Sequence, residues 1–115
     1  MTASVVLRTF HRARTIVRLN EMYLRNVRPA IYRSKNGCVT KYIPYKTDYE
    51  PGCKMSQLFE MSAQTDRVMT DLDNCSAKFP TQYVSLVGID TDRPEVIDSL
   101  YLCYKPLYGH IKQVP

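Results

Sequence analysis

The first 27 residues combine apolar and basic positions at helical spacing. Apolar residues recur at intervals of three, four and seven, at Val6, Phe10, Ala13, Val17, Leu24 and Val27. With 3.6 residues per turn, these positions share one side of a helix. Five arginines fall on its other sides, namely Arg8, Arg12, Arg14, Arg18 and Arg25. The pattern predicts a long amphipathic helix that ends near Arg28, because Pro29 disfavours helical backbone at the residue before it.

A turn signal and a short β-prone run follow this helix. Asn36-Gly37 favours backbone with positive φ, which is typical of a turn. Residues 38–43 contain Val, Thr, Tyr and Ile, and Pro44 closes the run. We expect a short strand here, which either pairs with residues 30–33 as a hairpin or stands alone.

Two more helices and one strong strand are predicted in the rest of the chain. Residues 55–72 predict a helix with a patchy apolar face, made up of Leu58, Met61, Val68, Met69 and Leu72. Residues 82–89 are uncharged and β-rich, and they predict the best strand of the chain. Asp92, Pro94 and Glu95 fit a capping box, which predicts a third helix over residues 94–104.

The order of these elements predicts an α+β fold. It would consist of a long basic amphipathic N-terminal helix, a small two- or three-stranded sheet with two further helices, and an extended C-terminal tail. We place the helix at residues 1–28, the α+β domain at 29–104 and the tail at 105–115. The length of 115 residues is the usual size of one domain.

The positive charge of the chain is confined to its N-terminal end. The formal net charge is +5, yet residues 1–35 carry +7 and residues 36–115 carry −2. The first 20 residues hold four arginines, four hydroxyl residues and no acid, which is typical of a mitochondrial targeting segment. Three interpretations stay open: a retained helix that docks in an assembly, a plain surface helix, and a cleaved leader. We favour the retained helix, because the apolar stripe continues past residue 20 to Val27.

The sequence contains no candidate transmembrane helix. Its longest run without a charged residue is residues 79–89, whereas a membrane-spanning helix needs about 20 apolar residues. We expect a mitochondrial protein of the matrix or of the inner-membrane surface.

No catalytic, cofactor or metal site is expected. The only histidines, His11 and His110, lie in the Arg-rich helix and in the tail, where the sequence places no nucleophile beside a base. With four glycines, the chain has no Gly-rich phosphate loop. The four cysteines lack the close pairing of zinc ligands, so we expect reduced, partly buried thiols.

Tyrosine is the main aromatic residue of this chain, with nine copies and no tryptophan. Tyr101, Tyr104 and Tyr108 gather near the C-terminus. Tyrosines of this kind either contribute to an interface or serve as the core aromatics of a chain that lacks tryptophan.

These observations favour a non-catalytic accessory subunit of a large mitochondrial assembly, foremost a respiratory-chain or ATP-synthase complex. Its partners would be protein subunits, with the apolar stripe as the docking surface. One alternative is a mitochondrial ribosomal protein whose arginine arm lies on rRNA phosphates. Another is a regulatory protein that uses the basic helix on an anionic lipid surface.

Overall fold

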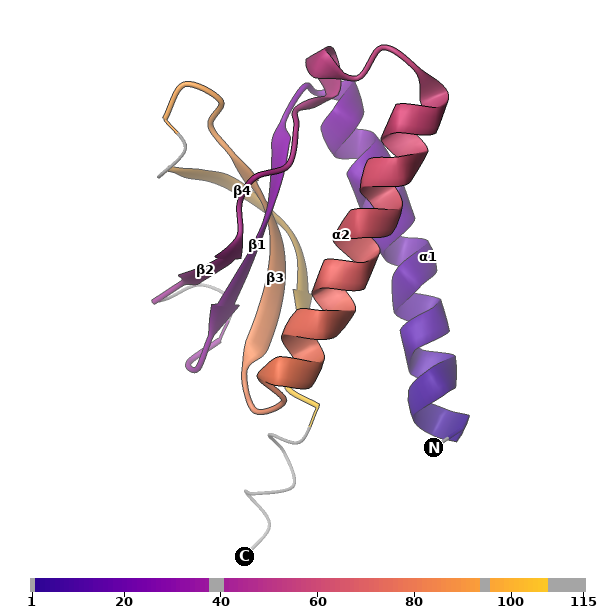
Figure 1. Ribbon diagram of the computed structural model, residues 1–115. Coiled ribbons are helices and arrows are strands. Elements are labelled where there is room, and N and C mark those ends of the chain that lie inside the picture. The colour runs from indigo at the N-terminus through magenta and orange to yellow at the C-terminus, as the bar shows by residue number, and fades with distance from the viewer. Residues whose placement is uncertain (1, 38–40, 94–95, 108–115) are drawn as a thin grey trace, which may run out of the picture.

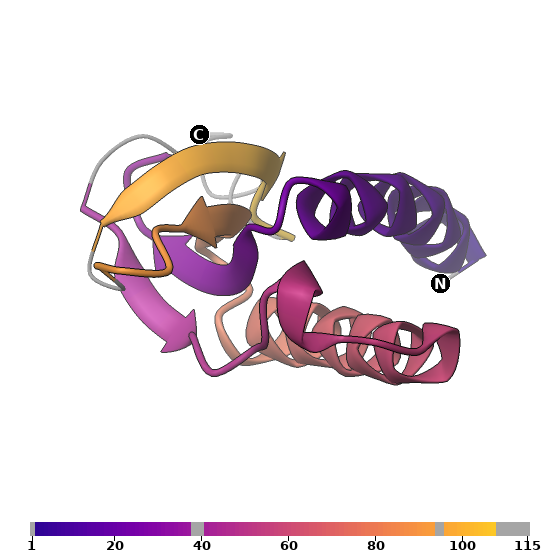
Figure 2. The same cartoon turned by 90° about the horizontal axis from the view of Figure 1, so that it is seen from above.

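Two helices pack on one face of a four-stranded antiparallel sheet (Figures 1 and 2). The computed structural model describes residues 2–37, 41–93 and 96–107, with side chains from Arg12 onward. In chain order the elements are α1 (Thr2–Leu24), β1 (Arg28–Ser34), β2 (Ile43–Lys46), the 3-10 turn η1 (Gly52–Lys54), α2 (Leu58–Lys78), β3 (Tyr83–Ile89) and β4 (Ile97–Tyr104). The α+β class predicted from the sequence is confirmed.

The strands are arranged in the order β2-β1-β3-β4. Both β2 and β3 run antiparallel to β1, so they are parallel to each other with β1 between them. Helix α2 connects these two parallel strands, which makes β2-α2-β3 a split β-α-β unit. Among the described strands, the sheet therefore ends at the four-residue β2 on one side and at the eight-residue β4 on the other.

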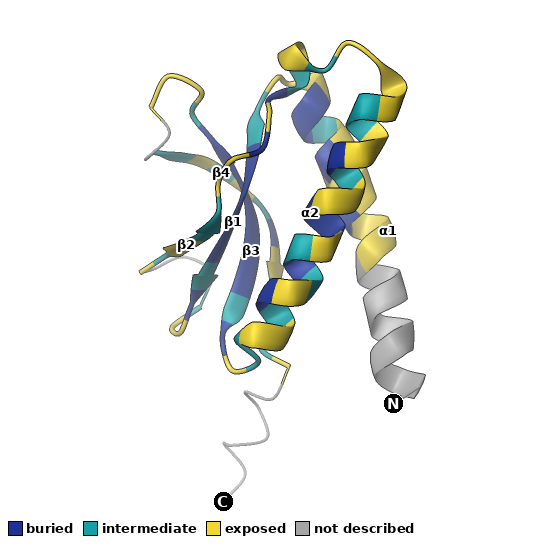
Figure 3. Ribbon diagram, in the orientation of Figure 1, coloured by how far each residue is buried: buried dark blue, intermediate teal, exposed yellow. Residues whose placement is uncertain are grey.

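The two central strands are buried on both faces (Figure 3). On the helix side, Ile31, Val84 and Leu86 join the main core with residues of α1 and α2. On the other side, a second cluster contains Ala30, Tyr32, Val87 and Ile89, with Tyr42 and Ile97 packed against it. This burial explains why residues 83–89 carry no charge: a charged side chain here would have to be desolvated.

The prediction of a third helix over residues 94–104 is wrong, since Ile97–Tyr104 forms β4, and the sheet has four strands rather than two or three. Val87 lies opposite Leu100 while Leu86 lies opposite Leu102, so Tyr101 is an extra residue. This β-bulge breaks the alternation of inward and outward side chains and leaves apolar spacing that resembles a helix.

Of the expected capping box, Asp92 lies in a turn, where its N–H donates to Asp90 Oδ1 at 2.8 Å. Residues 94–95 lie outside the described residues.

Other element boundaries also shift from those predicted. Helix α2 runs Leu58–Lys78 instead of ending at residue 72, because Val68, Leu72 and Cys75 continue its buried face. Pro44, which was expected to close a strand, lies inside β2 on the sheet edge, where a missing N–H costs little. The strand expected at residues 38–43 lies later in the chain, at Ile43–Lys46, where it pairs with β1 as a hairpin. Residues 38–40 and the tail from 108 onward lie outside the described residues.

Helix α1 ends at Leu24, before the predicted stop at Arg28. Asn26 adopts a positive φ of 59° and donates its N–H to the Tyr23 carbonyl at 3.1 Å, while Val27 donates to the Met22 carbonyl at 2.9 Å. These two bonds form a Schellman motif, with Asn26 as the left-handed residue. The helix is thus terminated by Asn26 and not by Pro29.

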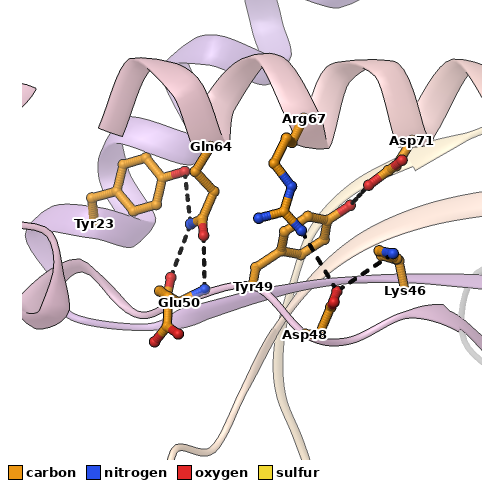
Figure 4. A network of polar contacts seen from close by, with 8 residues as sticks. All are labelled: Tyr23, Lys46, Asp48, Tyr49, Glu50, Gln64, Arg67 and Asp71. Atoms are coloured by element: carbon orange, nitrogen blue, oxygen red, sulfur yellow. Dashed lines mark hydrogen bonds and ion pairs between the residues drawn. The ribbon is translucent and has the colours of Figure 1, made fainter. Parts of the chain in front are cut away.

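The segment after β2 is clamped to α2 by polar contacts (Figure 4). The Gln64 side chain accepts the Glu50 N–H at 2.8 Å and donates to the Glu50 carbonyl at 2.9 Å and to the Tyr23 hydroxyl at 3.2 Å. Next to it, the buried Tyr49 donates its hydroxyl to Asp71. Gln64 therefore ties both the loop and α1 to α2.

Replacing Gln64 by Leu should destabilise the protein by about 2–4 kcal/mol, because the buried Tyr23 hydroxyl and the partly buried Glu50 backbone would lose their partners. Urea unfolding followed by circular dichroism measures this loss. The matched control is Gln57→Leu, since Gln57 is exposed and its side chain makes no capping bond to α2. Equal stability of the two variants would contradict the clamp.

Candidate protein-docking site

Helix α1 packs on the core through one narrow face. Its fully or nearly buried side chains are Thr15, Leu19, Met22 and Tyr23. Three of them belong to the main core cluster, and the Thr15 hydroxyl is hydrogen-bonded to that of Tyr104 at the end of β4. These positions lie roughly opposite Val17 around the helix, given 3.6 residues per turn.

The apolar stripe predicted from the sequence faces mostly away from the core. Ala13 is exposed, Val17 is 56% exposed and Leu24 is 87% exposed. Val27 differs, because it lies past the helix end and packs on the core, close to Gly88. Val6 and Phe10 belong to α1, but their side chains lie outside the described residues. Three described stripe residues, Ala13, Val17 and Leu24, are thus exposed, while a second set of apolar residues holds α1 to the core.

The predicted arginine face is partly engaged within the chain. Arg12 pairs with Asp73 of α2 at 3.2 Å, and Arg18 pairs with Glu21 at 3.1 Å. Arg14 also lies on the exposed surface of α1, Arg25 is exposed just past its end, and the side chain of Arg8 lies outside the described residues. The two ion pairs are half-exposed, and such surface pairs contribute about 0–1 kcal/mol. A partner with acidic groups could therefore replace them at small cost.

The most exposed large apolar residues lie at one end of the helical layer. They are Leu24 at the end of α1 (87% exposed) and Leu58 and Phe59 at the start of α2 (83% and 67%). Figure 1 shows the end of α1 and the start of α2 at the same end of the molecule. We call these three residues the apolar end. Leu58 was expected to face the core, but it is the first residue of α2, ahead of the turns that pack on the sheet.

A small pocket lies between α1, α2 and the end of β4. Its volume is about 60 Å³, and Arg12, Thr15, Asp73 and Tyr104 contribute to its lining. This volume holds a few water molecules, whereas sites for small ligands are typically about 300–1,000 Å³. The pocket is too small for a metabolite.

Two of the three tyrosines near the C-terminus pack against the main core. Tyr101 and Tyr104 pack against the main cluster, and Tyr108 lies outside the described residues. Burial raises the pKa of Tyr104 to about 12, and the nearby carboxylate of Asp73 adds to this increase while Arg14 and Arg12 oppose it. Tyr101 and Tyr104 thus act as core aromatics in this chain, which contains no tryptophan.

The described cysteines are in three different states. Cys103 is disulfide-bonded, which corrects the expectation of reduced thiols throughout. Cys75 is a buried free thiol, and burial raises its pKa to about 11 against the opposing effect of Arg33 and Lys78. Cys53 is free and exposed on η1. Of the two free thiols, only Cys53 is accessible to reagents in the folded protein.

Neither a membrane span nor a metal-binding cluster is found among the described residues. No helix among them is both long enough and apolar enough to span a membrane. In the same part of the chain, no group of three or more His, Cys, Asp or Glu side chains is arranged to hold a metal ion. Comparison with protein-family models, curated proteins and solved structures found no match for this chain.

Thiol titration without reductant should distinguish the three cysteine states. In the folded protein Cys53 should react rapidly with an aromatic disulfide reagent, and Cys75 should react only after unfolding. The variant Cys53→Ser should lose the rapid phase and keep the slow one. A Cys103 thiol that reacts without prior reduction would contradict the disulfide.

The raised pKa of Tyr104 should lower the free energy of unfolding at high pH. An unfolded tyrosine titrates near pH 10, and Tyr104 titrates at about 12 in the folded state. The folded state therefore keeps the proton longer, and the free energy of unfolding should fall as pH rises from about 10 to about 12. Denaturant unfolding at a series of pH values should show a smaller fall for Tyr104→Phe than for the wild type. Parallel curves would contradict the raised pKa.

Proposed function

We propose that the protein is a non-catalytic accessory subunit that docks on a partner protein through the outward stripe of α1. The observation that carries this proposal is the division of α1 into two apolar faces, only one of which contacts the sheet. Val17 and Leu24 are largely exposed, whereas Leu19 and Met22 of the same helix are fully buried. Clustered exposed apolar residues are a common feature of interaction sites.

The charges around the stripe indicate what the partner surface would be like. Arg14, Arg18 and Arg25 flank Val17 and Leu24, and α1 contributes only one acid, Glu21. An apolar groove bordered by Asp or Glu would complement this pattern, since opposite charges at the rim of an interface favour correct orientation and fast association. The partner would thus be an acidic protein surface with an apolar centre.

The proposed setting is a large mitochondrial assembly, of which a respiratory-chain or ATP-synthase complex is the leading example. The acid-free, arginine-rich first 20 residues support this setting, since they have the composition of a targeting segment. The disulfide at Cys103 favours an oxidising compartment. Within this proposal we therefore place the subunit on the oxidising side of the inner membrane and not in the matrix.

The test is native purification of the full chain with a C-terminal tag from mitochondria. The wild type should migrate with a complex far larger than itself and bring down the same subunits each time. The double variant Val17→Ser, Leu24→Ser should lose this association about tenfold or more, because two central contacts disappear. The matched control, Ile43→Ser, removes an exposed apolar residue from β2, and this variant should still associate with the complex.

Import and folding are measured in the same samples, by fractionation and by protease resistance. Serine leaves the charge of the segment unchanged, so import of the double variant should remain normal. A wild-type protein that stays monomeric in purified mitochondria, or is absent from them, would overturn the proposal.

A second candidate function, binding to a membrane surface, is favoured by the apolar end. Leu24, Leu58 and Phe59 project where Arg25 and Lys54 are also exposed, and interfacial binding combines apolar insertion with attraction to anionic lipid. In flotation assays, anionic vesicles should retain the wild type, and Leu58→Ser, Phe59→Ser should abolish that retention. If neither anionic nor neutral vesicles retain the protein, this candidate is excluded.

A further inference from the structure

We propose that β4 is a self-association edge, through which two copies of this chain pair antiparallel and extend the sheet to eight strands. The proposal goes beyond docking through α1 and uses none of the residues of the α1 stripe. It starts from the strand order, in which β4 is the last strand. Over Ile97–Leu102, the described residues provide a strand neighbour for β4 only on the side of β3.

An edge strand presents backbone N–H and C=O groups that can pair with another strand, and monomeric proteins usually protect such edges. The opposite edge of this sheet is protected: β2 is four residues long and contains Pro44 and Lys46. In contrast, β4 is eight residues long and has neither proline nor lysine. Its two register shifts with β3 bend the strand locally, but they add no charge to the edge.

The side chains of β4 are mostly uncharged, which favours contact with a second copy over exposure to water. Asp98 is the only charged residue among the eight, and Leu100 is 44% exposed although it lies opposite the buried Val87. A strand from a second copy would cover Leu100 and continue the apolar cluster that Val87 belongs to. Cross-strand apolar pairs of this kind contribute about 0.2–1 kcal/mol each.

The charge pattern fits antiparallel self-pairing in particular. Asp98 lies near the start of β4, so a two-fold axis through the middle of the strand places it opposite the uncharged end of the other copy. Parallel pairing in register would instead bring the two Asp98 carboxylates side by side, which is unfavourable. An axis perpendicular to the sheet keeps both helical layers on the same face, and closed two-fold dimers are the commonest protein oligomers.

The experiment is sedimentation velocity of the purified full chain over a dilution series. The wild type should change from monomer to dimer as its concentration rises. Leu100→Lys should raise the dimer dissociation constant by about tenfold or more, because it places a positive charge from each copy at the edge. The matched control, Ile43→Lys, adds the same charge to the β2 edge and should leave the dissociation constant unchanged.

Hydrogen exchange of the unmodified protein supplies a second readout that does not depend on a variant. The amides of residues 97–102 should exchange more slowly at concentrations where the dimer forms. A protein that remains monomeric throughout, a dimer weakened by Ile43→Lys instead of Leu100→Lys, or exchange in β4 that does not depend on concentration would each overturn the proposal. A monomer that still binds its assembly through α1 would leave the proposed function intact.

Discussion

The pairing of β1 with β3 is the interaction on which the rest of the structure depends. Seven consecutive residue pairs, from Arg28 with Ile89 to Ser34 with Tyr83, connect strands that lie about 50 residues apart in sequence. The buried faces of these two strands then provide both cores: the main cluster under the helices and the smaller cluster on the far side. Neither helix has a surface to pack on until this ladder exists, and β2 and β4 have no other strand to pair with.

A sheet of only four strands limits how much of a helix can be buried. Thr15, Leu19, Met22 and Tyr23 occupy the surface that the sheet and α2 offer to α1. Among the other described apolar residues of α1, Ile16, Val17 and Leu24 remain exposed. In α2, by contrast, the buried face extends from Gln64 to Cys75, and the exposed large apolar residues are limited to Leu58 and Phe59 at its start. This difference between the helices supports the proposal that the interaction surface lies on α1.

Sequence patterns predicted the class of fold, α1, most of α2 and nearly all of β3, because each of these has a long and regular pattern. They failed where a local signal competes with tertiary pairing. The apolar spacing of residues 96–104 suits a helix, and only the ladder with β3, with its bulge at Tyr101, makes the segment a strand. The stripe on α1 was recognised, but the sequence could not show that Leu19 and Met22 would face the sheet and Val17 would not. The end of α1 depended on the left-handed backbone of Asn26, which its residue type permits but does not require.

The long separation between β1 and β3 also orders events during synthesis. When α1 and β1 have left the ribosome, β1 can pair only with the short β2, and the ladder must wait until residue 89 has been made. Until then, the buried and outward faces of α1 are equally accessible, and its arginines have no partner from α2. The basic end of the chain therefore waits longest between its synthesis and its packing on the sheet. A receptor or chaperone that binds this segment would therefore have until the synthesis of β3 to do so.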